Sequence, residues 1–173
     1  MPRAQTKIIQ NENFNSPTLG ELTLDEVVSQ ISGFIGQDRE MSYKLVIGTD
    51  SQVKHENGVQ DVDFVSAIVI HRQGKGGRYF WHRIRDQKIY SLKERIFTET
   101  YFSLELAQKL VPILKEAVFG LAPYELEIHI DVGEVGKTRE MIKEVVGMVT
   151  GNGFVAKTKP ESYGASKVAD KHT

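Results

Sequence analysis

The segment KLVIGTD, residues 44–50, decides the fold because a short apolar run leads directly to an acidic residue. Its three consecutive branched apolar residues are typical of a largely buried strand. The polar stretch at 52–60 contains Asn57 and Gly58 and therefore predicts a turn. We expect a buried strand that ends at Asp50.

Two further strands follow this one at short intervals. Residues 62–71 are rich in valine, isoleucine and phenylalanine, and residues 78–85 supply a third strand. The glycine-rich stretch 73–77 between them is typical of a hairpin connection. Three strands joined by short turns predict an antiparallel meander, because parallel neighbours need a longer crossover.

Helices and strands alternate in the rest of the chain. Ser91 and Glu94 form a capping box, so a helix begins there and extends to about residue 119, with Pro112 bending or interrupting it. The later elements expected from periodicity and glycine signals are a strand at 125–132, a helix at 138–150, a strand at 154–159 and a closing helix at 165–172.

The N-terminal part has a different pattern. Residues 1–20 show little periodicity and predict an irregular arm, whereas Thr23 and Glu26 form a capping box before a helix at about 24–36. The predicted fold class is α/β, with a five-stranded mixed sheet and helices on both faces. Three antiparallel strands come first, and crossover helices add the other two.

Length and composition limit the possible classes of protein. A chain of 173 residues predicts a single domain over 1–173, with the arm and extra helix at 1–43 and the core at 44–173. The absence of cysteine excludes disulfides, Cys-ligated zinc and a thiol nucleophile. A net charge of −1 argues against a uniformly basic surface but leaves a local basic face open. We expect a cytoplasmic protein without a membrane partner, since no apolar run is long enough to span a bilayer.

Two aspartates, Asp50 and Asp131, each end a predicted strand. Ligand sites in open α/β sheets form at such strand ends near the sheet centre. Two carboxylates there repel each other unless a cation lies between them, and Mg²⁺ or Mn²⁺ prefers carboxylate oxygen. Either aspartate alone is also explained as a turn former or a helix cap, so the pair is the stronger indication.

A third candidate ligand, Glu99, lies on the predicted long helix. It falls on the apolar stripe that contains Phe102 and Leu106, where an unpaired carboxylate is costly. A salt bridge from Glu99 to Arg95 or Lys93 is the structural alternative.

Two further acids complete the set. Glu105 lies on a different side of the same helix, which predicts that it is solvated, so Glu99 is the preferred candidate. Asp170 stands between Lys167 and Lys171 near the C-terminus, and by itself it carries almost no weight.

In order along the chain, Asp50, Glu99, Asp131 and Asp170 occupy the first strand, the first crossover helix, the fourth strand and the last helix. This order resembles the ribonuclease H-like fold, whose acidic residues come from those elements. The strings GTDSQ at 48–52 and YGASKVAD at 163–170 are similar to the bacterial YkuK family, which is described as predicted ribonuclease H-like nucleases. The helix expected at 24–36 has no equivalent in the minimal fold, and Glu105 stays open as the helical acid.

The resemblance implies a metal-dependent nuclease that hydrolyses phosphodiester bonds in RNA, an RNA–DNA hybrid or structured DNA. Two Mg²⁺ or Mn²⁺ ions, about 3.5–4 Å apart, would activate water and stabilise the leaving oxygen. Asp50 would bridge them, and Glu99, Asp131 and Asp170 would complete the site. His129 would orient a ligand or assist proton transfer, unless it is a satisfied core histidine.

Basic and aromatic residues concentrate between residues 71 and 85. This composition is typical of a surface that follows phosphates and stacks bases, although a solvated hairpin with inward-facing aromatic rings would share it. A predicted helix N-terminus near residue 138 is a second possible phosphate contact. The residues expected to bind substrate are Ser51, Gln52, Lys75, Arg78, Arg83, Lys137 and Arg139.

Nucleic acid is therefore the expected partner. The alternative is a non-catalytic module that binds nucleic acid or protein on the same fold, and a third hypothesis is a phosphotransfer or nucleotide-binding enzyme. The sequence leaves the polymer and the oligomeric state open.

Overall fold

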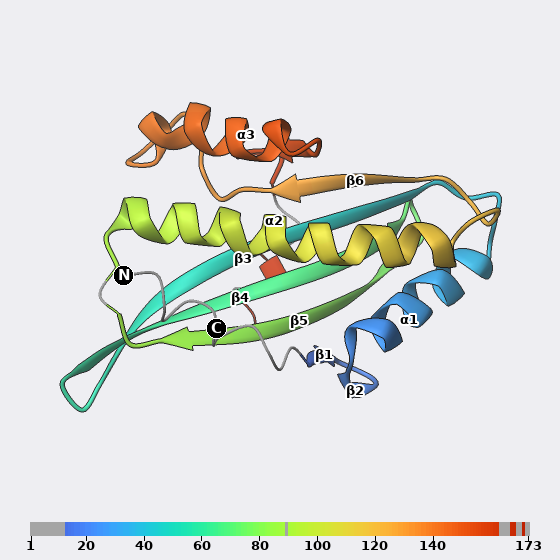
Figure 1. Cartoon of the computed structure of the whole chain (residues 1–173), viewed down its shortest axis with the longest axis horizontal. Helices are drawn as coiled ribbons and strands as arrows, with labels where there is room; N and C mark the ends of the chain where they lie inside the picture. Colours follow the sequence, from blue (N-terminus) through green and yellow to red (C-terminus); the bar gives the residue numbers. More distant parts are fainter. Residues whose placement is uncertain (1–12, 89, 163–166, 169–170, 172–173) are drawn as a thin grey trace.

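The computed structural model describes residues 13–88, 90–162, 167–168 and 171. Its strands form a seven-stranded sheet in the order β2-β1-β5-β4-β3-β6-β7, and Figure 1 shows the long strands β3, β4, β5 and β6 of this sheet. The antiparallel part consists of β3 (Tyr43–Glu56), β4 (Val59–Arg72) and β5 (Gly77–Asp86). Two more strands, β6 (Tyr124–His129) and β7 (Val155–Lys157), continue the sheet in parallel with β3.

Three α-helices cover one face of this sheet (Figure 1). They are α1 (Leu24–Gly36), α2 (Leu92–Ala117) and α3 (Ile142–Gly151), and a 3₁₀ turn (Arg139–Met141) precedes α3. Both predicted capping boxes lie at helix starts, where Thr23 accepts from the Glu26 amide and Ser91 from the Glu94 amide. The mixed α/β architecture predicted from the sequence is therefore confirmed.

The strands of the meander present alternate residues to two different environments. On β3, Leu45 and Ile47 belong to the main core under the helices. Val46 points to the opposite face, where it packs with Ala67 and Val69, and Val168 from the C-terminal part contacts them. Because Asp50 is an even number of residues from Val46, its side chain belongs to this second face.

The prediction of five strands is wrong, because the sheet has seven. The five predicted strands are present, and two short ones, β1 (Phe14–Ser16) and β2 (Gly20–Leu22), extend the sheet beyond β5. They lie in the segment predicted to be an irregular arm. Three-residue strands show no measurable alternation, and tertiary burial of Phe14, which is fully enclosed, fixes them instead.

The predicted turn at 52–60 is also wrong. Strand β3 continues to Glu56, and the chain reversal is confined to Asn57 and Gly58. Their φ angles of 51° and 76° fit a tight two-residue hairpin. Polar residues in this stretch occupy an exposed, antiparallel hairpin instead of a loop. Asp50 therefore lies well inside β3 and does not end it.

Helix α2 runs to Ala117 without interruption, although Pro112 lies inside it. Proline removes one backbone hydrogen bond, but Leu110 and Leu114 on either side are fully buried and anchor the last turns. The helix predicted at 138–150 begins with the 3₁₀ turn, and most of the closing helix predicted at 165–172 lies outside the described residues. Of that segment, Lys167, Val168 and Lys171 are helical.

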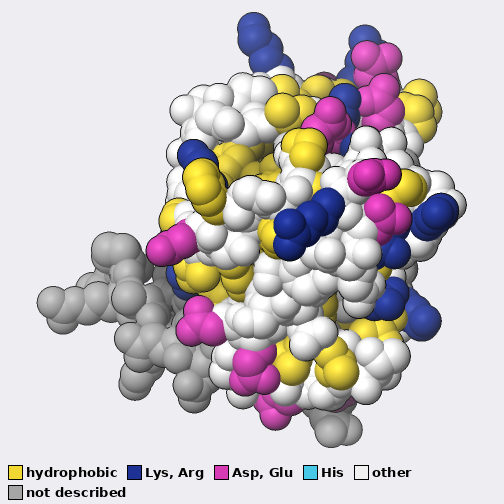
Figure 2. Space-filling model, turned by 90° about the vertical axis from the view of Figure 1, so that its right-hand side faces the viewer, with side chains coloured by type: hydrophobic (Ala, Val, Ile, Leu, Met, Phe, Trp, Pro, Cys, Tyr) yellow, Lys and Arg dark blue, Asp and Glu magenta, His cyan; other side chains and the backbone are white. Residues whose placement is uncertain are grey.

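The end of the molecule near α1 carries charges of both signs (Figure 2). Lysine, arginine and acidic side chains alternate there with apolar ones, so this face is not a continuous basic surface. No helix in the described part of the chain is both long and apolar enough to cross a membrane.

Candidate acidic site

Three of the candidate acids lie around the point where β3 and β6 separate. These two strands pair from Tyr43 with Tyr124 as far as Gly48 with His129, and there β6 ends. Beyond that point β3 continues through Asp50, and the chain leaving β6 reaches Asp131. The antiparallel meander lies on one side of β3 and the crossover strands on the other, so this is the point of the sheet at which ligand sites form.

Glu99 reaches this point from α2. Its side chain is buried, with an exposed fraction of 6%, and its Oε1 accepts a hydrogen bond of 2.5 Å from the Ser51 hydroxyl. Ser51 follows Asp50 on β3 and points toward α2, whereas the amide of Ser51 donates to the Asp50 carboxylate at 2.9 Å. Ser51 thus contacts both acids, through its amide with Asp50 and through its hydroxyl with Glu99.

Burial raises the pKa of Glu99 to about 8. The hydrogen bond from Ser51 and the charge of Arg95 act in the opposite direction, while the negative charges of Asp50 and Asp131 raise the pKa further. The structure therefore brings three of the four predicted acids within electrostatic reach of one another. A cation among them would favour the ionised form of Glu99.

Small hydroxyl side chains fix α2 against β3 next to this acid. The Thr49 hydroxyl lies 2.7 Å from that of Ser66 on β4 and 2.8 Å from that of Ser103 on α2. All three residues are buried. Since buried polar groups hold a fixed geometry only when they are satisfied, this network sets the position of Glu99 one helical turn away.

Asp131 has a cationic partner within the protein. Lys159 Nζ lies 2.8 Å from Asp131 Oδ1, and the Lys159 amide donates to the Val132 carbonyl at 2.8 Å, so the segment after β7 is fastened beside the end of β6. Gly133 gives this segment room, because a Cβ there would lie 3.1 Å from the Lys159 Cβ. Lys159 thus shows that a cationic group fits beside the Asp131 carboxylate.

The donor types fit a hard divalent ion, because all of them are carboxylate oxygens. Among the described residues, however, no three acidic or histidine side chains converge closely enough to hold one ion. Glu99 is turned to Ser51 and Asp131 to Lys159. Metal binding would therefore require both carboxylates to leave these partners. Asp170, the fourth predicted ligand, lies outside the described residues.

The alternative acid and the neighbouring histidine have other partners. Glu105 forms an ion pair of 3.2 Å with Lys109, but its side chain is only 22% exposed and its other carboxyl oxygen is buried, so the prediction that it is solvated is wrong. His129 Nε2 lies 3.0 Å from Glu127 Oε2, and Lys44 lies 3.3 Å from the other oxygen of Glu127. Burial lowers the pKa of His129, while the contact with Glu127 acts in the opposite direction.

The predicted substrate-binding residues divide into two groups. Arg83 shares a row of the sheet with Asp50, because both pair with Val65 of β4. Ser51 contacts Glu99, and Gln52 on β3 is exposed next to it in the chain. Lys137 and Arg139 are exposed on the segment that follows Asp131.

Lys75 and Arg78 are not brought to the acids. Lys75 lies in the turn between β4 and β5, at the other end of the meander. The Arg78 guanidinium stacks on the ring of Phe34 at 4.9 Å from its centroid, which is a structural contact with α1. A cleft of about 620 Å³ lies on this side of the protein, and its described lining contains Arg78 and Phe34 but no carboxylate.

Sequence reasoning missed several residues around the site. Thr49, Ser103 and Lys159 gave no motif, because single hydroxyl and lysine residues are common on any surface. The one available signal was the position of Thr49 and Ser103 on faces expected to be apolar. Asp63 was also missed, although it lies in an otherwise apolar strand and is fully buried.

Comparison with known proteins places the chain in a family. A family model described as "Ribonuclease H-like" matches residues 26–173. The chain is also 34% identical over 165 residues to "Uncharacterized protein YkuK" of Bacillus subtilis (strain 168), a match that covers 88% of this chain and 92% of the relative. No solved structure matches. The chain therefore belongs to the YkuK family of ribonuclease H-like proteins.

Proposed function

We propose that this protein is a metal-dependent nuclease that hydrolyses phosphodiester bonds in nucleic acid. The observation that carries the proposal is the buried Glu99 carboxyl, whose pKa is raised to about 8 by burial and by the nearby charges of Asp50 and Asp131. Acids gathered at a sheet switch point, with perturbed protonation, are typical of sites with a chemical task. The ribonuclease H-like family makes nuclease chemistry the first candidate for that task.

Asp50, Glu99 and Asp131 are the residues that would hold two Mg²⁺ or Mn²⁺ ions, with Asp170 as a fourth ligand. Bound ions would supply an activated water and stabilise the charge on the leaving oxygen. Burial favours the protonated form of Glu99 in the metal-free protein, while the Ser51 hydroxyl holds the side chain in place. Arg83, Lys137 and Arg139 would orient the phosphate, because guanidinium and ammonium groups pair with its oxygens.

Calorimetry with Mg²⁺ and Mn²⁺ tests this proposal. We expect binding by the wild type and none by the double variant Asp50→Asn with Asp131→Asn. A control with the same change in charge is Asp25→Asn with Glu144→Gln, two exposed helix residues that should leave binding intact. Absence of binding at millimolar metal, with and without an oligonucleotide, would exclude the two-metal mechanism.

A second candidate function is a non-catalytic binding module on the same fold. One observation favours it: the contacts of Glu99 with Ser51 and of Asp131 with Lys159 satisfy two of the acids within the protein. Oligonucleotide binding that is independent of metal and never leads to cleavage would favour this function. Cleavage that requires Mg²⁺ or Mn²⁺ and is lost in the double variant would exclude it.

A further inference from the structure

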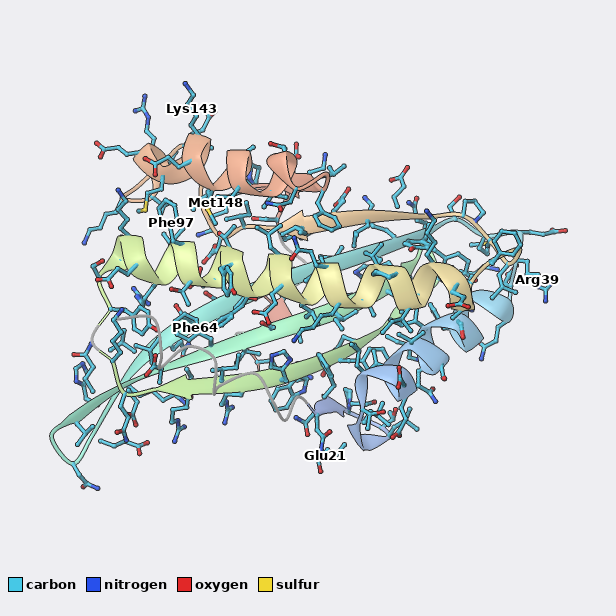
Figure 3. All side chains as sticks on the ribbon, viewed as in Figure 1. Glu21, Arg39, Phe64, Phe97, Lys143 and Met148 are labelled. Atoms are coloured by element: carbon cyan, nitrogen blue, oxygen red, sulfur yellow. The ribbon has the colours of Figure 1, made fainter. Side chains whose placement is uncertain are left out.

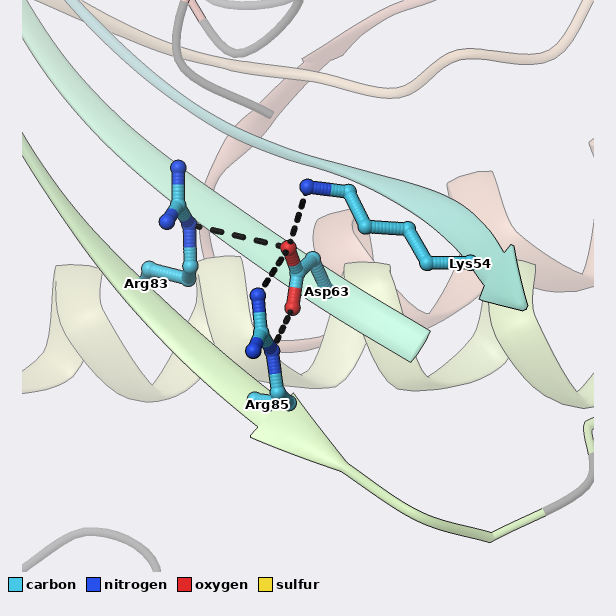
Figure 4. Close-up of polar contacts among 4 residues, drawn as sticks. All are labelled: Lys54, Asp63, Arg83 and Arg85. Atoms are coloured by element: carbon cyan, nitrogen blue, oxygen red, sulfur yellow. Dashed lines mark hydrogen bonds and ion pairs between the residues drawn. The ribbon is translucent and has the colours of Figure 1, made fainter. Parts of the chain in front are cut away.

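A buried aspartate holds three cations on the face of the sheet opposite α1, α2 and α3 (Figure 4). Asp63 of β4 has no exposed surface, and its Oδ1 accepts a hydrogen bond of 2.7 Å from Arg85 Nε. Its Oδ2 lies 2.9 Å from Lys54 Nζ and 3.8 Å from Arg83 Nε. We call Lys54, Arg83 and Arg85 the Asp63 cation cluster.

Asp63 fixes these cations because it stays ionised inside the protein. The hydrogen bond from Arg85 is the largest influence on its pKa, which is lowered to about 2, while burial acts in the opposite direction and Lys54 lowers it further. Burying a charge is costly unless it is paired and hydrogen-bonded. Asp63 meets this condition with one cation from β3 and two from β5, the strands on either side of its own.

The cations remain accessible while they hold this carboxylate. Their side chains are 28%, 37% and 47% exposed for Lys54, Arg83 and Arg85. Arg85 directs two N–H groups to Asp63, at 2.7 and 3.3 Å, and its guanidinium has five. The cluster therefore presents guanidinium donors to solvent, and the buried Asp63 carboxylate fixes their orientation.

Two nearby acids reduce the positive electrostatic potential of the cluster. Glu56 and Asp61 lie near enough to Arg85 to contribute to its raised pKa. The surroundings are therefore a mixture of charges and not a broad basic patch, in line with the net charge of −1 for the whole chain. An anion would be held here by directed N–H donors at short range, and not by a long-range field.

An aromatic ring and the acidic site are both close to the cluster. Trp81 precedes Arg83 by two residues on β5, so both lie on the same face, with the Arg83 guanidinium 5.8 Å from the Trp81 ring centroid. Arg83 lies in the same row as Asp50, two strand spacings away, or about 9.6 Å between backbones. Cations beside an aromatic ring are the combination that binds phosphates and stacks bases of unpaired strands.

We propose that the Asp63 cation cluster binds the phosphate backbone of single-stranded nucleic acid and leads it to the acidic site. The choice of ligand rests on the proposed function, because the acids beside the cluster are assigned to phosphodiester chemistry. Asp63 acts as a positioning residue in this arrangement, and Arg83 and Arg85 make the contacts.

Fluorescence anisotropy with a labelled oligonucleotide of about 12 nucleotides tests the proposal in EDTA, where no cleavage occurs. We expect the wild type to bind, and Arg83→Gln and Arg85→Gln each to weaken binding about tenfold. Each should also reduce the slope of log K against log salt by about 0.7 between 50 and 200 mM salt. Lys143→Gln is the matched control, since Lys143 is exposed on the outer side of α3 (Figure 3).

A second variant separates binding from folding. Asp63→Asn combined with Arg85→Gln removes one charge of each sign, so the local net charge is kept and no buried carboxylate loses its main partner. It should fold, as judged by its circular dichroism melt, and bind as weakly as Arg85→Gln.

The outcomes distinguish the cluster from the nuclease. A wild type that does not bind, or arginine variants that bind like Lys143→Gln, would overturn the inference even if metal-dependent cleavage is found. Binding that falls in the arginine variants supports the cluster even if the wild type never cleaves, a result that would count against the nuclease alone.

Discussion

Glu99 and Asp63 are two buried carboxyl groups on opposite faces of the same sheet, and their pKa values move in opposite directions. The pKa of Glu99 is raised to about 8, whereas that of Asp63 is lowered to about 2. Burial penalises the charged form of both groups and is the largest influence on the pKa of Glu99, whereas for Asp63 the hydrogen bond from Arg85 outweighs it. Three cations surround Asp63, while Glu99 receives one hydroxyl hydrogen bond and faces two other acids.

This difference separates an acid that is paired within the sheet from one that is left beside other acids. Asp63 is satisfied entirely by side chains of its own sheet, and its charge organises a surface. Glu99 is held where added negative charge is unfavourable, an arrangement that an ordinary core does not require. The predictions below test this contrast.

The largest expected effect is a gain in stability from Glu99→Gln at high pH. The folded pKa of about 8 lies above the ordinary glutamate pKa of 4.5, so the folded chain holds a proton that the unfolded chain releases between these values. Stability therefore falls as pH rises through this window. Without metal, Glu99→Gln should be more stable than the wild type by about 4 kcal/mol at pH 8.5 and nearly equal at pH 4.5.

Urea unfolding in EDTA at both pH values measures this gain. Glu105→Gln on the same helix is the control, because Glu105 forms an ion pair with Lys109 and should show no comparable change with pH. Equal pH dependence in the wild type and in Glu99→Gln would mean that Glu99 does not titrate as inferred.

A smaller effect of opposite sign is expected for Asp63→Asn. The folded pKa of about 2 lies below the ordinary aspartate pKa of 3.8, so this group contributes stability that is fully present above pH 3.8 and is lost as pH falls toward 2. At pH 7 the variant should lose about 2–3 kcal/mol, which lowers Tm by about 5–10 °C.

Thermal melts of Asp63→Asn at pH 7 and pH 2.5 check both size and direction. Asp25→Asn, an exposed residue in the first turn of α1, should change little at either pH. If Asp63→Asn is as stable as the wild type at pH 7, the ion pairs between Asp63 and the three cations do not stabilise the fold.

Much of the fold was predictable because its signals are local. The capping boxes at Thr23 and Ser91 place the starts of α1 and α2, and apolar periodicity gives the five main strands. The hairpin of β3 and β4 was not predictable, because polar residues after Asp50 are compatible with a turn and with an exposed strand. The pairing that decides between them is a contact between distant positions.

The candidate site could likewise be predicted only in part. Glu99 could be selected because a carboxylate on an apolar stripe is unusual, and the structure buries it beside Asp50 and Asp131. The Lys159 contact with Asp131 depends on a chain reversal after β7, and the grouping of three cations around Asp63 depends on strand register. Neither leaves a spacing in the sequence that could be recognised.

The smallest expected effect concerns Lys159 and the cation at Asp131. Lys159 is 57% exposed, so its ion pair with Asp131 is weak, and an ammonium there competes with a metal for the same carboxylate. Lys159→Gln should bind Mg²⁺ about threefold more tightly than the wild type.

The matched control is Lys157→Gln. Lys157 lies two residues earlier and pairs with the exposed Glu161 at 3.7 Å, so its loss should change Mg²⁺ affinity much less. Calorimetry on both variants measures the difference. Weaker binding by Lys159→Gln would mean that the ammonium supports the acidic site instead of competing with the metal, and Asp131 would then resemble Asp63 more than Glu99.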